Sequence, residues 1–521
     1  TYSDSNNQIL NTQIANKTKT SSLLDDRFPM PFDIAASNWM LFSGDNTDTG
    51  NALFAGSPDL APTLPGLFYV MHIQGGDIDA MGGVLPGVPS LGPLGYNGFL
   101  AFSAVNGRGD EMDYFIEKLN PDNPDQYLTE SGYKDFKIIE DTLKVKDGDS
   151  FRTEKITIKI SRHGPIISDV LPGSPENCAM QWAALDLPNR DIDGLIKLVK
   201  ARSFDEFRMA LSYVRTINLG IGYADKEGNI GWQFTAAPPI RKKGKGSYPV
   251  PGWTGEYDWE GFVPFEKIPY DFNPNEGYVA SFNNEPGNVD YYMSNYYLFE
   301  RAMRFEDLMK ERPQKKVSFE ELKSMQLDTA SAVAKRWVPL ALSVCLKDKS
   351  LQTCTDLLKG WDLRIDRDSS AATLFNYFYY LMMKYTLADE IGEKIWSEDL
   401  GKEYLYYVPD VVMTRIVNQS DHQFYDDVST ADKKEIREDI IKKAMSDAIK
   451  YLNDRLGDNT DDWKWGDLHQ MVFKHPLGSK LSFLNLDPIP TDGSPHTINA
   501  GFWDTANPFE FSSGGAIRMM V

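Results

Sequence analysis

The residue best suited to nucleophilic chemistry is Ser37, in the stretch Ala36-Ser37-Asn38-Trp39. A serine hydroxyl is a weak nucleophile at neutral pH and needs an adjacent base. If the bond between Ala36 and Ser37 were cut, Ser37 would carry its own base, because an α-amino group has a pKa near ~8. While that bond is intact, the nitrogen is an amide and provides no base. Read alone, without the residues that follow, Ser37 is better explained as one of many loop serines.

The composition indicates a globular chain and excludes two kinds of partner. Of its 521 residues, 41% are hydrophobic and 12% aromatic, which suits a folded protein of roughly two to four structural units. The formal net charge is −21, and Lys and Arg are not clustered as phosphate binding requires, so we expect no nucleic-acid partner. No apolar run approaches the roughly 18–20 residues that span a bilayer, so we expect no transmembrane segment.

The cysteines and the chain ends leave the cellular compartment open. Cys345 and Cys354 are close enough in sequence to close a small loop, which would leave Cys178 single. Three cysteines are too few for a disulfide scaffold. The chain begins at Thr1 without Met and stops on an apolar stretch, so we expect a piece of a longer product or a chain that has lost a leader.

Strands and turns dominate the chain between a polar connector and residue 298. Residues 1–36 are rich in polar residues, as a mobile connector or spacer is. The hairpin pattern Ile221–Trp232 turns at Glu227-Gly228-Asn229, and apolar spacings of three and four predict a helix over 191–211. Short apolar runs bounded by Gly and Pro predict further strands at 51–55, 66–73, 98–105, 136–139, 156–160 and 165–167.

Helical periodicity replaces this β pattern after residue 298. The periods at 299–345 and 369–452 predict a mainly helical insertion over 299–462. From Trp463 onward the β pattern returns, notably at Ser494–Ala500. We therefore expect an α+β chain with a β-rich core at 37–298, the helical insertion at 299–462, and a return to the β core at 463–521.

Five short motifs, taken in order, resemble the penicillin acylase family of N-terminal-nucleophile hydrolases. The resemblance extends from Ser37 to Val521, and it implies an αββα sandwich as the fold of the catalytic core. The ordered set is far more specific than any one member. Its members are Ser37-Asn38-Trp39, Ser57-Pro58-Asp59-Leu60, Ala104-Val105-Asn106-Gly107, Tyr278–Asn284 and Arg301–Phe305.

The resemblance assigns roles around Ser37 to four further residues. The Val105 backbone N–H and the Asn283 side-chain amide would form the oxyanion hole, where two fixed donors stabilise the charge that develops on an attacked amide oxygen. Asp59 replaces a residue that holds the nucleophile's amine in relatives, and its carboxylate would raise the pKa of that amine. Arg304 would orient the Asn and lower the same pKa. Without the family resemblance, Asp59 and Asn283 would be interpreted as turn residues. Val105 would be a core residue, and Arg304 would lie on the surface of a helix.

A calcium site and a substrate pocket are also implied. Asp110 and Asp113 resemble the family's calcium loop, with carbonyl oxygens of Met112 and Pro239 and the side chain of Asn295 as further ligands. Oxygen donors of this kind suit Ca²⁺, and no organic cofactor is expected. Leu60, Ser103 and residues of the loop 81–94 would line an apolar acyl pocket.

The resulting hypothesis is an amidohydrolase that removes an apolar acyl group through an acyl-enzyme on Ser37, after autoproteolysis at Ala36–Ser37. Its expected partners are a small acylated amide and the N-terminal α-subunit segment of the same precursor, and its expected location is periplasmic or secreted in a bacterium. The alternative is a non-catalytic or unprocessed acylase scaffold that binds an acylated ligand. A glycan-cleaving protein is less favoured, because no paired-carboxylate motif is found.

Overall fold

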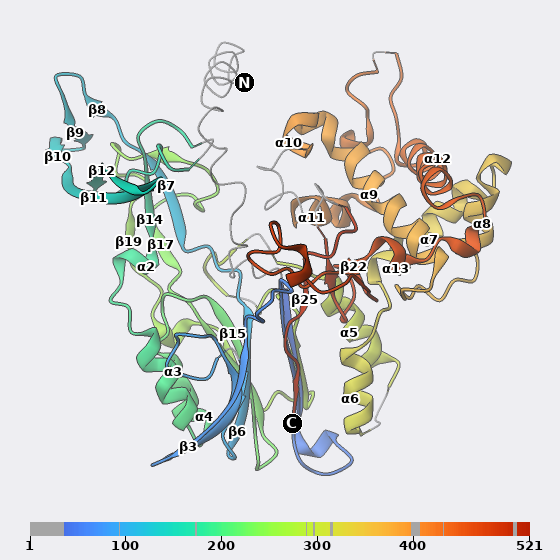
Figure 1. The fold of residues 1–521 in the computed structure, drawn as a ribbon, viewed down its shortest axis with the longest axis horizontal. Helices are drawn as coiled ribbons and strands as arrows, with labels where there is room; N and C mark the ends of the chain where they lie inside the picture. Colours follow the sequence, from blue (N-terminus) through green and yellow to red (C-terminus); the bar gives the residue numbers. More distant parts are fainter. Residues whose placement is uncertain are drawn as a thin grey trace.

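Two β-sheets face each other at the centre of the computed structural model, and helices cover both outer faces (Figure 1). The structure describes residues 36–92, 94–171, 174–287, 289–294, 297–312, 316–397, 407–430, 432–503 and 508–521. From left to right, Figure 1 shows a helical layer, the two sheets edge-on and a second helical layer. This succession is the αββα sandwich. The connector at 1–35 lies outside the described residues.

The sheet that contains Ser37, called the Ser37 sheet, is antiparallel and buried at its centre. Strand β1 pairs on one side with β2 and on the other with β21, and all seven of its residues are buried. The order is β21-β1-β2-β25-β24, with β26 also beside β2. The strands are β1 (Ala36–Phe42), β2 (Leu53–Leu60), β21 (Tyr278–Ser281), β24 (Gly501–Phe502), β25 (Ser513–Gly515) and β26 (Met519–Met520).

The facing sheet, called the Val105 sheet, is a seven-stranded antiparallel sheet in the order β20-β16-β15-β6-β5-β4-β3. The predicted hairpin at 221–232 is present as β15 and β16, which turn at Asp225–Asn229. The strands are β3 (Tyr69–Gly75), β4 (Ile78–Val84), β5 (Leu94–Tyr96), β6 (Leu100–Asn106), β15 (Leu219–Asp225), β16 (Ile230–Thr235) and β20 (Tyr270–Phe272).

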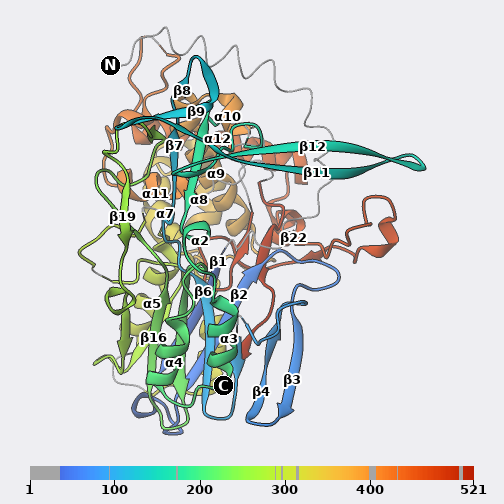
Figure 2. The same cartoon turned by 90° about the vertical axis from the view of Figure 1, so that its left-hand side faces the viewer.

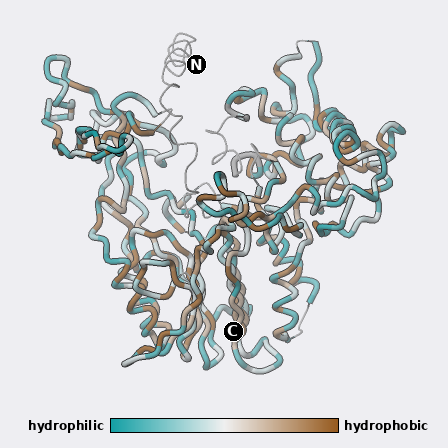
Figure 3. Tube along the Cα trace, in the orientation of Figure 1, coloured by the Kyte–Doolittle hydropathy of each residue, from teal (hydrophilic) through white to brown (hydrophobic). Residues whose placement is uncertain are grey.

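Trp39 joins the two sheets. Its ring lies between them, and its indole Nε1 donates to the Gly220 carbonyl oxygen of β15 at 3.0 Å. A Cβ at Gly222 would lie 2.9 Å from the Trp39 ring, so a glycine there makes room for the indole. The surrounding apolar cluster includes Leu41, Phe54, Ala101, Val105, Ala224 and Ile230. Figure 3 shows hydrophobic segments running through both sheets.

The outer helices pack on the sheets through apolar faces. On the Val105 sheet, the single helix predicted at 191–211 is two helices, α3 (Asp191–Lys200) and α4 (Phe204–Leu211). The break occurs because Ser203 is an N-cap whose hydroxyl accepts from the Glu206 N–H, which starts a new helix. On the Ser37 sheet, α5 (Glu300–Lys310) and α6 (Phe319–Gln326) contribute Phe305, Leu322 and Met325 to the core.

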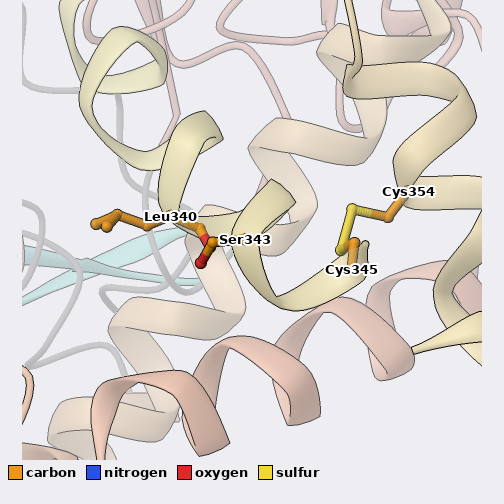
Figure 4. Close-up of a disulfide and its surroundings, with 4 residues drawn as sticks. All are labelled: Leu340, Ser343, Cys345 and Cys354. Atoms are coloured by element: carbon orange, nitrogen blue, oxygen red, sulfur yellow. A yellow bond between two sulfur atoms is a disulfide. The ribbon is translucent and has the colours of Figure 1, made fainter. Parts of the chain in front are cut away.

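A helical unit follows these layers and is built around α9. Its 22 residues are largely buried, so this helix is hydrophobic on all sides rather than on one face. A disulfide joins Cys345 and Cys354 there, with Cα atoms 6.2 Å apart (Figure 4), and Cys178 is a buried free thiol. The helices are α7 (Ala332–Cys345), α8 (Gln352–Leu358), α9 (Ser370–Ile391), α10 (Glu393–Ser397), α11 (Tyr407–Ile416), α12 (Arg437–Leu456) and α13 (Trp465–Leu468).

Smaller sheets decorate the sandwich, and β11 and β12 form a long hairpin that projects from it (Figure 2). Ser494–Ala500, predicted as β, is a loop because Pro495 and hydrogen bonds between Ser494 and Thr497 favour a turn. Among the described residues, no helix has the length and apolar character that crossing a bilayer requires. The remaining elements are α2 (Ala183–Asp186), β7 (Met112–Ile116), β8 (Leu119–Asn120), β9 (Asn123–Thr129), β10 (Gly132–Asp135), β11 (Lys137–Asp147), β12 (Ser150–Ser161), β13 (Gly164–Pro165), β14 (Cys178–Trp182), β17 (Pro239–Arg241), β18 (Val250–Pro251), β19 (Trp259–Phe262), β22 (Gln470–Met471) and β23 (Ile489–Pro490).

Candidate active site

Ser37 lies at the start of β1 and is buried, with its side chain turned back along the chain. Its Oγ donates to the Ala36 carbonyl oxygen at 2.5 Å. The hydroxyl therefore lies beside the peptide group that precedes it. Strand pairing with β2 places Ser37 opposite Pro58 and Ala36 opposite Asp59.

Asn283 connects Ser37 to the facing sheet. Its Oδ1 accepts from the Ser37 N–H at 2.9 Å, and its Nδ2 donates to the Asn106 carbonyl oxygen at 2.8 Å. The contact forms because β21, which ends at Ser281, pairs with β1. Asn283 has φ 65°, the left-handed region that Asn tolerates better than most residues. The backbone bend aims the amide at both sheets.

Val105 is brought to the same place from the Val105 sheet. It precedes Asn106 in β6, whose carbonyl oxygen receives the Asn283 amide. Its side chain is buried in the apolar cluster between the sheets. The structure thus brings Ser37, Asn283 and the end of β6 together although they are far apart in sequence.

Arg301 is the cation at this site, and the sequence analysis missed it. In α5, its Nη2 donates to the Asn283 Oδ1 at 2.6 Å and to the Phe282 carbonyl oxygen at 2.7 Å. Its Nη1 donates to the Ser37 carbonyl oxygen at 3.1 Å. The side chain is fully buried among these acceptors. Arg301 holds Asn283 in the orientation that meets Ser37.

Arg304, which the sequence had favoured for this role, binds a different partner. Its Nε and Nη2 donate to the two carboxylate oxygens of Asp328 at 3.0 and 2.9 Å. Residues 301 and 305 are both buried on one face of α5, whereas Arg304 is partly exposed. The helical period, measured from the apolar Phe305, could have singled out Arg301.

Asp59 is buried next to the guanidinium of Arg301. Its Oδ2 lies 3.5 Å from the Arg301 Nη1, and its Oδ1 accepts from the Ser57 hydroxyl at 3.1 Å. Burial raises the pKa of Asp59 to about 6, although Arg301, Arg518 and the Ser57 hydroxyl oppose the rise. Across the strand pair from Ala36, this carboxyl can change the charge around Ser37 in the physiological pH range.

The predicted substrate-binding residues lie inside the sandwich. Leu60 is buried in β2 and pairs with Gly514. Ser103 is buried in β6 on the same face as Val105, because alternate residues of a strand share a face. A Cβ at Gly56 would lie 2.5 Å from the Ser103 Cβ, so β2 and β6 approach closely at this point.

The residues proposed for calcium do not fit a metal site. Asp110 and Asp113 bind the guanidinium of Arg241, which lies in β17 together with Pro239. Met112 starts β7, and Asn295 lies outside the described residues. Within the described ranges, no group of three or more His, Cys, Asp or Glu side chains is arranged to hold a metal ion.

The chain is similar in sequence to a family of amidases and to individual acylases. Residues 3–521 match the family described as penicillin amidase. The chain is 28% identical over 516 residues to the acyl-homoserine lactone acylase QuiP of Pseudomonas syringae pv. syringae, covering 94% of this chain and 61% of the relative. It is 29% identical over 285 residues to penicillin G acylase of Escherichia coli, covering 53% of this chain and 32% of that protein.

A solved structure supports the fold. The thermostable penicillin G acylase from Alcaligenes faecalis superposes with a TM-score of 0.67 at 19% identity, covering 84% of this chain and 82% of that one. The predicted αββα fold of the N-terminal-nucleophile type is therefore confirmed. The chain spans about three-fifths of the length of the curated relatives, 61% for the Pseudomonas syringae protein.

Proposed function

This chain belongs to the penicillin amidase family, and we propose that it is the catalytic part of an acylase that hydrolyses the amide of a small N-acylated molecule through Ser37. The observation that carries the proposal is the meeting of three groups at one buried point. The Ser37 hydroxyl donates to the Ala36 carbonyl oxygen, and the Ser37 N–H donates to the Asn283 Oδ1. The Asn283 Nδ2 donates to the Asn106 carbonyl oxygen at the end of β6.

The first step of the proposal is cleavage of the chain by Ser37 itself. The Ser37 Oγ, which lies 2.5 Å from the Ala36 carbonyl oxygen, attacks the carbon of that carbonyl. The C–N bond breaks, the hydroxyl proton passes to the leaving nitrogen, and Ala36 becomes an ester on Oγ. Water hydrolyses the ester, which frees a carboxylate on Ala36 and an amine on Ser37.

The second step uses the new amine as the base. It takes the proton of Oγ, through one water, as Oγ attacks the substrate amide. The Val105 N–H and an Asn283 N–H would stabilise the oxyanion. An amide nitrogen carries two N–H groups, and in the described part of the chain the Asn283 Nδ2 has one acceptor, Asn106. The amine product leaves, and water hydrolyses the acyl-enzyme.

The substrate class we propose is an amide with an apolar acyl group, tested first on N-acyl-homoserine lactones. Six relatives bear the printed name acyl-homoserine lactone acylase. Two others are penicillin acylases, so a phenylacetyl amide is the second substrate to test. Leu60 and Ser103 would line the acyl pocket. Such pockets separate acyl chains by only ~1–3 kcal/mol per methylene.

The proposed partner and location extend this function. We propose that an N-terminal segment of the same precursor completes the pocket, since the chain covers only 61% of its relative. We also propose export from a bacterial cell, because disulfides such as Cys345–Cys354 form and persist in oxidising environments and are rare in the cytosol.

Processing at Ala36–Ser37 is the direct test. Mass spectrometry and N-terminal sequencing of the purified chain should find a fragment that begins at Ser37. Ser37→Ala should give neither the fragment nor acyl release from an N-acyl-homoserine lactone. Asn283→Ala should lower kcat by roughly 10²–10³, because one oxyanion donor is lost.

Ser343→Ala serves as the matched control, because Ser343 is an exposed helix serine whose hydroxyl donates to the Leu340 carbonyl oxygen (Figure 4). It should be processed as the parent chain is. Intact chain after long incubation together with the N-terminal segment, and no acyl release, would contradict the enzyme. An acylated ligand bound with the same affinity by Ser37→Ala would then favour the non-catalytic scaffold.

A further inference from the structure

A buried salt bridge occupies the loop where the sequence predicted calcium. The guanidinium of Arg241 donates from Nε to the Asp113 Oδ2 and from Nη2 to the Asp113 Oδ1, both at 2.8 Å. The same Nη2 donates to the Asp110 Oδ1 at 3.3 Å and to the Asp110 carbonyl oxygen at 3.2 Å. The Arg241 and Asp113 side chains are each 4% exposed. One cation thus serves both carboxylates.

Two further donors complete the shell of these carboxylates. The Trp259 indole Nε1 donates to the Asp113 Oδ2 at 2.6 Å, and the Tyr292 hydroxyl donates to the Asp110 Oδ2 at 3.2 Å. Every oxygen of the two carboxylates therefore accepts from a protein donor. Calcium needs about 6–8 oxygen ligands at 2.3–2.6 Å, and here the oxygens are turned to N–H and O–H groups instead.

The backbone fixes the guanidinium in this place. Arg241 ends β17 and pairs with Trp259 of β19, which brings the indole to the same carboxylate. Gly246, at φ +72°, closes the cluster: a Cβ there would lie 1.9 Å from the Asp113 Oδ1 and 2.9 Å from the Arg241 Nη2. The space next to the carboxylates is filled by the protein itself.

We propose that Arg241 is a built-in cation that takes the place of a divalent metal, so that this chain folds without calcium. A guanidinium matches carboxylate geometry with two parallel N–H donors, and it keeps its charge at all relevant pH values. Asp110 lies in the segment that leads from Asn106, and its N–H donates to the Met293 carbonyl oxygen at 2.7 Å. Arg241 therefore binds the residue through which that segment contacts the stretch that follows Asn283.

The test compares thermal unfolding of the purified chain in EDTA and in millimolar CaCl₂, with calcium titration calorimetry alongside. The parent chain should have the same Tm in both solutions and show no calcium binding. Arg241→Ala should have a lower Tm, because the buried Asp113 and the partly buried Asp110 lose their cation. Calcium should then raise the Tm of Arg241→Ala by about 3 °C or more, since the freed oxygens can take a metal.

Arg304→Ala is the matched control, because it removes an arginine that also binds one carboxylate, Asp328, with two hydrogen bonds. The other carboxylate that Arg304 contacts, Glu311 at 3.5 Å, belongs to an exposed side chain. Its Tm should fall and should not recover with calcium. If Arg241→Ala does not fold, Arg241→Lys keeps a charge without the paired donors, and its Tm should lie below that of the parent chain. A parent Tm that falls in EDTA and returns with calcium would overturn the proposal, as would an Arg241→Ala chain indifferent to calcium. Neither readout depends on acylase activity, so failure of the proposed function would leave this result intact.

Discussion

Three charged side chains act on the charge around the Ser37 nitrogen, and two of them, Arg301 and Asp59, are buried. Arg301 contacts the Ser37 carbonyl, Asp59 lies 3.5 Å from Arg301, and Arg518 is close enough to act on the Asp59 carboxyl. Two cations oppose protonation of a neighbouring amine, while one carboxylate favours it. The base strength of a freed Ser37 amine therefore depends on whether Asp59 is charged.

Asp59→Asn should make the amine a weaker base and shift the pH profile of the acylase. Without the carboxylate, Arg301 and Arg518 lower the pKa of the amine with no opposition. We expect the acid limb of kcat/KM to move to lower pH by roughly one pH unit. Initial rates from pH 4 to 9 measure this. Asp122→Asn is the control, because it removes an exposed carboxylate and should leave the acid limb of kcat/KM unchanged. An acid limb at the same pH in Asp59→Asn and Asp122→Asn would show that Asp59 does not act on the amine.

The same substitution should change stability with a defined sign. The pKa of Asp59 is raised from 3.8 to about 6, chiefly by burial, so the folded state holds the proton where the unfolded chain has lost it. The protonated Asp59 therefore contributes its full stabilisation below its unfolded pKa of 3.8. This contribution is lost as the pH rises through the folded pKa of about 6. The loss is up to roughly 3 kcal/mol. Urea unfolding of Asp59→Asn should lack this decline.

The sequence identified most of the residues that meet at Ser37 but chose the wrong arginine. Asn283 and Val105 could be named because their motifs carry the family resemblance, and Ser37 because its nitrogen can become a base. Arg301 was missed because two arginines lie three residues apart in one helix. Arg301 shares a helix face with Phe305, which packs on the Ser37 sheet, and the spacing of four between these two residues was not used.

At the scale of elements, the two sheets approach closely because small residues face large ones. Gly222 leaves room for the ring of Trp39, and Gly56 leaves room for Ser103. The Trp39 indole also donates across the gap to Gly220. Since Ser37 and Trp39 belong to the same strand, the distance between the sheets controls how near Val105 comes to the nucleophile.

Gly222→Ala should destabilise the fold by overpacking. The new methyl group would meet the Trp39 ring at 2.9 Å, where neither sheet can move freely. We expect a loss of about 1–3 kcal/mol in the free energy of unfolding, measured by urea denaturation. Gly75→Ala is the control, because a Cβ there meets nothing within 4 Å in a strand on the edge of the same sheet. Equal losses in the two variants would contradict the tight fit at Trp39.

Periodicity predicted element types better than element ends. The hairpin of β15 and β16 was predicted because its turn residues are local signals. The helix over 191–211 is two helices, because the Ser203 cap competes with a periodicity that continues across it. The loop at 494–500 was mistaken for a strand, because its side-chain bonds between Ser494 and Thr497 satisfy the backbone locally.

At the scale of the whole molecule, a buried polar cluster joins the helical unit to the C-terminal loops. The His496 Nε2 lies 2.9 Å from the Asp410 Oδ2 of α11, and the Tyr379 hydroxyl of α9 donates to the Asp410 Oδ1 at 2.9 Å. Burial lowers the pKa of His496, but the carboxylates of Asp410 and Glu300 outweigh it, so the pKa lies above its ordinary value. The loop leads on to Ala500, which packs against Ala36.

Asp410→Asn should remove a pH-dependent part of the stability. A raised pKa means that the His496–Asp410 pair stabilises the fold below the unfolded pKa of His, and that this stability is lost as the pH rises through the folded value. The free energy of unfolding should fall more steeply between pH 6 and 8 in the parent chain than in Asp410→Asn. Asp79→Asn, which breaks the exposed His72–Asp79 pair, should retain the parent slope.

The overall architecture was predictable because the family resemblance extends over most of the chain. The way in which the helical unit packs on the sandwich was not predictable from the sequence. It depends on contacts such as His496–Asp410, between residues 86 positions apart. The proposed replacement of a metal ion by Arg241 was equally hidden. Asp110 and Asp113 look the same in sequence whether a calcium ion or a guanidinium lies between them.

Strand β1 lies between β21 and β2 and not at an edge of its sheet. Chain ends ordinarily fray. A terminus created at Ser37 would instead stay paired with β2, with β21 pairing from Trp39 onward and the Asn283 Oδ1 hydrogen-bonded to its nitrogen. Cleavage would therefore produce the amine in the position from which it acts as a base, without a further change of conformation. The orientational entropy of the amine would already have been lost during folding, so its loss would not add to the barrier of the acylase reaction.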